Sequence, residues 1–134
     1  GLSKFSAAFV KQIVEQTQSH DFSIVYHNCG AKLVHLSKII EAGADVYHFG
    51  APMDIGIALE QVDKEIVLAG KLDPTAVFHS GSTEDVINST RSLLALSSGY
   101  KNFIPSSGCD IPPHTPVSNL DAFYSTVSNY PASL

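Results

Sequence analysis

Four segments that look like strands, each followed by a segment that looks like a helix, constrain most strongly what this chain can fold into. Strands are predicted at residues 22–27, 45–49, 65–69 and 101–105. Apolar residues at helical spacing predict helices at 31–42, 54–62 and 82–99, one from Ser118 onward, and an amphipathic helix at 2–18 before the first strand. Strands that alternate with helices form a parallel sheet with right-handed crossovers, so the predicted class is α/β.

This pattern is compatible with two architectures. Four βα units make half of an eight-stranded TIM barrel, and they also fit a self-contained sandwich of the flavodoxin type. A chain of 134 residues has the length of one domain, and no low-complexity linker interrupts it. We therefore predict that residues 1–134 form a single domain.

Composition argues against two kinds of partner. The net charge is −5, and Arg91 is the only arginine, so the chain has no basic stripe that could follow a phosphate backbone. The apolar runs are much shorter than the roughly 20 residues that a membrane helix needs. We expect a cytoplasmic protein that binds neither nucleic acid nor membrane and whose two cysteines are reduced.

Polar and potentially reactive residues follow each of the four predicted strands. Ligands of parallel α/β folds bind at this carboxyl edge of the sheet, where the βα loops lie. The candidate residues are His27, Asn28 and Cys29 after the first strand, His48 after the second, Lys71 and Asp73 after the third, and Ser106, Ser107, Cys109 and Asp110 after the fourth.

His27, Cys29 and Cys109 form a candidate metal-binding set. His27 and Cys29 are two residues apart, so on a strand their side chains point to the same face. One imidazole and two thiolates are ligands that zinc prefers, and three protein ligands leave a position open for catalysis. The alternative is that both cysteines are small packed hydrophobic residues, because a His-x-Cys pair is a weak signal by itself.

Several longer stretches resemble one known family. They are HNCG at 27–30, GAD at 43–45, AGKLDP at 69–74 and SSGCDIPPHTPVSNLDAF at 106–123. Together they resemble the carboxyl-terminal part of the uroporphyrinogen decarboxylase superfamily. More narrowly, they are similar to its zinc-dependent branch, the methylcobamide:coenzyme M methyltransferases. The resemblance extends from about residue 23 to about residue 130.

The resemblance implies the carboxyl-terminal half of a TIM (β/α)8 barrel. It also implies that His27, Cys29 and Cys109 bind Zn²⁺, and that a methyl group passes from a methylated corrinoid, held by a separate corrinoid protein, to a small thiol such as coenzyme M. On this hypothesis Asp110 orients a ligand, and Lys71 neutralises an anionic tail such as a sulfonate. His48 is a third catalytic candidate, with a hydrogen-bonded core or loop histidine as its alternative.

Half a barrel leaves two sheet edges and its interior uncovered. We therefore expect a homodimer, a second chain that supplies the other half, or a longer protein of which this chain is a fragment. Two other functions are compatible with the sequence: decarboxylation of a tetrapyrrole, and a truncated binding module without catalytic activity.

Overall fold

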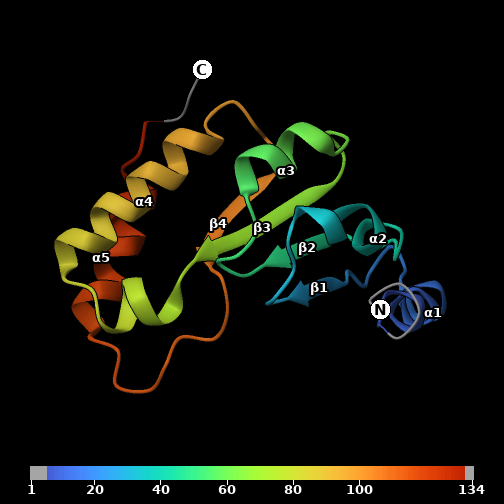
Figure 1. The fold of residues 1–134 in the computed structure, drawn as a ribbon, viewed down its shortest axis with the longest axis horizontal. Helices are drawn as coiled ribbons and strands as arrows, with labels where there is room; N and C mark the ends of the chain where they lie inside the picture. The colour runs from blue at the N-terminus through green and yellow to red at the C-terminus, as the bar shows by residue number, and fades with distance from the viewer. Residues whose placement is uncertain (1–5, 132–134) are drawn as a thin grey trace.

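The computed structural model describes residues 6–131, which form four parallel strands connected by helices (Figure 1). The strands are β1 (Val25–Asn28), β2 (Val46–Phe49), β3 (Val67–Leu72) and β4 (Phe103–Ser107). The helices are α1 (Ala8–Thr17), α2 (Leu36–Ile40), α3 (Ile55–Gln61), α4 (Thr83–Ser97) and α5 (Val117–Ser128), with two further helical segments, η2 (Leu33–His35) and η3 (Pro74–His79). No helix in this part of the chain is long and apolar enough to cross a membrane.

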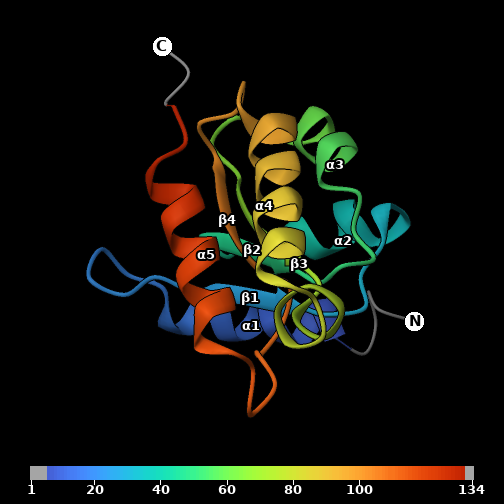
Figure 2. The same cartoon turned by 90° about the vertical axis from the view of Figure 1, so that its left-hand side faces the viewer.

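The strands lie in the sheet in the order of the sequence, β1-β2-β3-β4, and all neighbouring pairs are parallel. Right-handed crossovers between consecutive strands place every connecting helix on the same face of such a sheet. Figures 1 and 2 show α2, α3 and α4 over that face. A flavodoxin-type sheet reverses its strand order and carries helices on both faces, so the sequential order identifies part of a TIM barrel and excludes the sandwich.

The two faces of the sheet differ in burial. On β2, Tyr47 and Phe49 point toward the helices and are fully buried, whereas Val46 and His48 point to the other face and are half-buried. On the edge strands, Val25 is 61% exposed and Ile104 is 48% exposed. The helix-covered face therefore carries the core, where burial of each large apolar side chain contributes about 1.5–3 kcal/mol. The other face, called the open face below, corresponds to a barrel interior.

The predicted class and the order of elements are confirmed, but several boundaries were wrong. The first strand begins at Val25 rather than at residue 22, because Phe22 pairs with Ser19 in an isolated antiparallel bridge. The strands predicted at 65–69 and 101–105 run on to Leu72 and Ser107, because backbone pairing continues through polar residues. The helix predicted at 31–42 divides into η2 and α2. Residues 2–5 of the first predicted helix lie outside the described residues.

Two residues of the GAD stretch have structural roles. Gly43 has a φ of +78° just after α2, which is a left-handed conformation that glycine adopts without strain. The carboxylate of Asp45 accepts hydrogen bonds from the backbone N–H of Ile24 and from Nε2 of Gln18, each at 2.7 Å. These bonds lower the pKa of Asp45 and tie the start of β2 to the segment before β1.

Asn119 has a structural role in the long stretch 106–123. Its side chain on α5 is 2% exposed, and Nδ2 donates to the carbonyl oxygens of Phe78 at 2.9 Å and Gly81 at 2.8 Å. Its Oδ1 accepts from the hydroxyl of Thr83 at 3.1 Å. One buried amide therefore joins the end of η3 and the start of α4 to α5.

We predict that Asn119→Ala lowers the free energy of unfolding by about 2–4 kcal/mol, because buried carbonyl groups lose their donor. Asn129→Ala is the matched control: its amide contacts only the exposed carbonyl of Ser125, so the expected change is about 0.5 kcal/mol or less. Chemical denaturation of both variants measures the difference. Equal losses would contradict a structural role for Asn119.

Candidate metal centre

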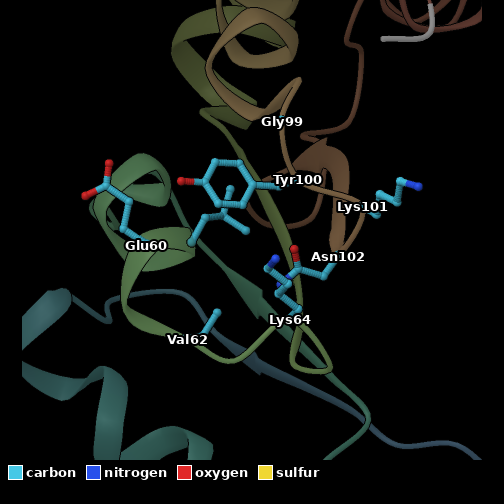
Figure 3. Close-up of a pocket in the computed structure, with 8 residues that line it drawn as sticks. Glu60, Val62, Lys64, Gly99, Tyr100, Lys101 and Asn102 are labelled. Carbon is cyan, nitrogen blue, oxygen red and sulfur yellow. The ribbon is translucent and has the colours of Figure 1, made fainter. Parts of the chain in front are cut away.

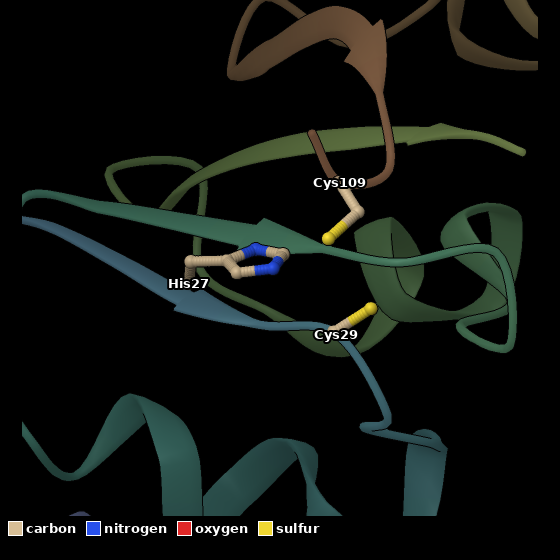
Figure 4. A group of neighbouring side chains, drawn as sticks. All are labelled: His27, Cys29 and Cys109. Atoms are coloured by element: carbon tan, nitrogen blue, oxygen red, sulfur yellow. The ribbon is translucent and has the colours of Figure 1, made fainter. Parts of the chain in front are cut away.

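The carboxyl ends of β1 and β4 bring His27, Cys29 and Cys109 together (Figure 4). His27 is on β1, Cys29 follows directly after this strand, and Cys109 lies two residues beyond β4. One ligand atom from each residue lies within 4.8 Å of the other two. His27 and Cys29 are exposed and Cys109 is half-buried, so the cluster is accessible from the open face.

The donor set fits a zinc ion. Both cysteines are free thiols, and the third donor is an imidazole nitrogen. Two sulfur ligands of a tetrahedral zinc ion lie about 3.8 Å apart, as follows from Zn–S bonds of about 2.3 Å. The sulfur atoms therefore need to approach each other by about 1 Å at most, since they lie within 4.8 Å, and rotation of the exposed Cys29 side chain can bring them closer.

Backbone groups approach each other closely around the two cysteines. A Cβ atom on Gly50 would lie 2.2 Å from the carbonyl oxygen of Cys29. A Cβ atom on Gly108 would lie 3.0 Å from the backbone of Gly50, Ala51 and Lys71. The chain segments that hold the sulfur atoms therefore pack by close backbone contact, which excludes a side chain at Gly50 and leaves little room for one at Gly108. Neither of these close contacts was predicted from the sequence.

His48 lies beside the cluster, on β2 and not in a loop. It is paired in register with His27 on β1, and Nδ1 of one ring is 2.8 Å from Nδ1 of the other. Its Nε2 lies 2.8 Å from the carbonyl oxygen of Ser107 and 3.0 Å from the hydroxyl of Ser106. The contact between the histidines was not predicted. The repeated tripeptide Val-Tyr-His, at 25–27 and at 46–48, is the sequence signal that points to it.

Lys71 and Asp110, the two other residues with a predicted catalytic role, lie near the same site. Lys71 is on β3, opposite Ser106 of β4, and its Nζ donates to the carbonyl oxygen of Ala51 at 3.5 Å. Asp110 is exposed and follows Cys109 directly. A cavity of about 510 Å³ extends over this region, and its lining residues are His27, His48, Ser107, Cys109, Asp110 and Ile111.

A larger cavity, of about 760 Å³, lies at the opposite edge of the sheet (Figure 3). Its lining comes from the α3–β3 and α4–β4 connections and includes Glu60, Lys64, Tyr100 and Lys101. None of the residues that line this larger cavity is a histidine or a cysteine. Parallel α/β folds place their chemistry at the carboxyl edge, so the smaller cavity is the better candidate for the functional site.

Fold and site together define a class: a protein of the TIM-barrel type with a candidate His-Cys-Cys metal centre at the carboxyl edge of its strands. The sequence profile of the Uroporphyrinogen decarboxylase (URO-D) family matches residues 2–130. The chain belongs to this family, as its motifs predicted.

Similar proteins agree with this assignment. Two proteins named Methylcobamide:CoM methyltransferase MtbA, from Methanosarcina acetivorans and Methanosarcina mazei, are each 30% identical to it over 127 residues. The alignments cover 95% of this chain but 36% of each relative. A solved structure of a methyltransferase from Methanosarcina mazei superimposes with a TM-score of 0.78 at 19% identity, covering 96% of this chain and 36% of that one. The chain thus spans about a third of the length of these proteins.

The pKa of Cys29 offers a test of the cluster in the metal-free protein. A hydrogen bond with Cys109 is the largest cause that raises this pKa, followed by desolvation and the negative charges of Cys109 and Asp73. A raised thiol pKa means less thiolate at a given pH. We predict that Cys109→Ala lowers the pKa, so that the alkylation rate of Cys29 reaches its midpoint at a lower pH.

Iodoacetamide alkylation across a pH series, read for Cys29 by peptide mass spectrometry, measures this midpoint. Asp110→Asn is the control, because Asp110 is adjacent to the cluster but is not among the causes of the shift. A midpoint that stays the same in Cys109→Ala would show that the thiols do not interact.

Proposed function

We propose that this chain carries the zinc-binding part of a cytoplasmic methyltransferase, which moves a methyl group from a methylated corrinoid to a thiol such as coenzyme M. The observation that carries the proposal is the convergence of His27, Cys29 and Cys109, with ligand atoms within 4.8 Å, in a chain of this family. The relatives that are 30% identical carry the name of this reaction.

His27, Cys29 and Cys109 would hold the ion. Zinc bound there would supply a position for a substrate thiol and lower its pKa, so that the sulfur reacts as a thiolate. The protein contributes two thiolates and a neutral imidazole, whose charges offset the 2+ charge of the ion. Because His27 and Cys29 are exposed and Cys109 is half-buried, a methyl donor can approach the site from the carboxyl edge of the sheet.

Lys71 and Asp110 are suited to bind and orient the substrate. Lys71 is on the same edge of the sheet, one strand away from the segment that carries Cys109. Its ammonium group is half-buried near the carbonyl of Ala51, where it can neutralise an anionic tail such as a sulfonate. Asp110 lines the cavity of about 510 Å³ over the cluster, where it can accept a hydrogen bond from a group that approaches the metal.

The open face requires a cover for catalysis. Within residues 6–131 no helix packs against the face that carries Val25, His27 and Ile104, and Val25 and Ile104 are largely exposed. A site that excludes water needs these positions covered. We propose that further barrel strands, from the same polypeptide, a second copy or a separate chain, cover the barrel interior. A corrinoid protein then docks at the carboxyl edge.

We predict that the purified protein binds about one zinc ion per chain and that Cys109→Ala weakens zinc binding by at least about 100-fold, because a direct ligand is lost. Elemental analysis and competition with a chelator measure this. His20→Ala is the control, since His20 is fully exposed and contacts only Asp21 in the described structure. Wild-type protein without zinc affinity would overturn the metal site.

Catalytic turnover provides a separate test of the proposed function. Protein that carries a complete barrel is expected to methylate coenzyme M with methylcobalamin as donor, and Cys109→Ala is expected to abolish this activity because the substrate thiol is no longer activated. Spectroscopy of the cobalt corrinoid and chromatography of the thioether product measure the transfer. Zinc binding without transfer would instead favour a binding module without catalytic activity.

A further inference from the structure

The hydrogen bonds of His48 determine where its own proton lies. Nε2 of His48 is 2.8 Å from the carbonyl oxygen of Ser107, and a carbonyl oxygen can only accept. Nε2 therefore carries the hydrogen, and it can share it with the hydroxyl of Ser106 at 3.0 Å. A neutral imidazole has a single N–H, so Nδ1 of His48 is left as an acceptor.

This acceptor then determines the tautomer of His27. Nδ1 of His27 lies 2.8 Å from Nδ1 of His48 and 3.3 Å from the backbone carbonyl of His48. Both of these groups accept, so Nδ1 of His27 carries the hydrogen. Nε2 of His27 keeps its lone pair, and Figure 4 shows the far edge of this ring directed toward the space between the two sulfur atoms.

From this chain of bonds we propose that His48 is a positioning residue that holds His27 in the tautomer with a hydrogen on Nδ1 and a metal-binding lone pair on Nε2. The inference rests on the proposed zinc site and extends it to a residue that is not a ligand. A histidine ligand almost always donates the N–H of its second nitrogen to a hydrogen-bond acceptor, and loss of such a partner typically weakens metal binding about 10- to 100-fold.

His48 also connects the two segments that supply the ligands. On one side its ring contacts His27 of β1, with ring centroids 4.7 Å apart and planes inclined by 37°. On the other side it donates to the carbonyl of Ser107, two residues before Cys109. The hydroxyl of Ser107 in turn donates to the carbonyl of Cys109 at 2.7 Å. A single ring on β2 thus sets the orientation of His27 and supports the loop that carries Cys109.

Three substitutions of His48 distinguish the effect of its Nδ1 hydrogen bond from the effect of its Nε2 hydrogen bond. Asn in place of His48 keeps an acceptor near the position of Nδ1, whereas Gln keeps a donor near the position of Nε2. Phe keeps a ring and removes both bonds. If the tautomer is what His48 provides, zinc affinity is expected to fall about 10- to 100-fold in His48→Gln and His48→Phe, and less in His48→Asn. His20→Phe is the matched control, at an exposed histidine outside the cluster.

The tautomer itself can be observed without metal. Two-dimensional ¹⁵N–¹H NMR of the metal-free protein, at a pH where both imidazoles are neutral, reports which nitrogen of His27 carries the hydrogen. We expect Nδ1–H in the wild type and in His48→Asn, and a shift toward Nε2–H, the form that free histidine prefers in water, in His48→Phe. Denaturation curves identify any variant that has lost its fold.

Two results would overturn the inference: a hydrogen on Nε2 of His27 in the wild type, or a folded His48→Phe variant that keeps the wild-type tautomer and zinc affinity. Wild-type protein that shows the expected tautomer but binds no zinc would overturn the proposed function and leave the role of His48 toward His27 standing. The two failures are therefore distinguishable.

Discussion

Parallel pairing of four strands in sequence order is the constraint on which the rest of this structure depends. It aligns the carboxyl ends of β1 to β4, so that residues distant in the sequence meet at one edge. Cys29 and Cys109 come together because their strands end at that edge, and His27 and His48 come together because their strands are in register. The helices on the other face hold this alignment by burying Tyr47, Phe49 and Leu68. The candidate metal centre is thus a consequence of strand order.

Polar groups at the strand ends then determine which atoms face the cluster. Backbone carbonyls of His48 and Ser107 accept hydrogen bonds from imidazole nitrogens, and within residues 6–131 Nε2 of His27 has no hydrogen-bond partner. The same dependence on backbone position applies to Asn119 and Asp45. Both residues belong to stretches that resemble a functional motif. Their side chains nevertheless form hydrogen bonds with backbone carbonyl and N–H groups, and these bonds hold the loops in place. The characteristic stretches of this chain therefore contain both candidate site residues and residues with a structural role.

Much of the fold could be predicted from the sequence, because apolar periodicity reports burial directly. Alternation of strands and helices gave the class, and the motifs gave the family. Strand ends were harder to predict: Lys71, Ser106 and Ser107 look like loop residues, and only pairing with a neighbouring strand makes them extended. The convergence of His27, Cys29 and Cys109 could be inferred from their positions after strands, whereas the bond between His27 and His48 depends on register. Periodicity indicates which face of each strand is buried, but a slip of two residues between neighbouring strands would leave that face unchanged, so burial alone does not fix the register.

The glycines beside the two cysteines limit how this site can change. A side chain at Gly50 would meet the backbone of Cys29, and one at Gly108 would press on the backbone of Gly50, Ala51 and Lys71, so substitution at either position would displace neighbouring main chain. On the proposed function, selectivity between reactants would arise further out, at the segment around Asp110 and Ile111 or at the part that covers the open face. The positions of Gly50 and Gly108 tolerate little change, whereas the residues around them can vary. Related sequences could therefore differ in the substrates that they bind while keeping the same arrangement of sulfur and nitrogen donors.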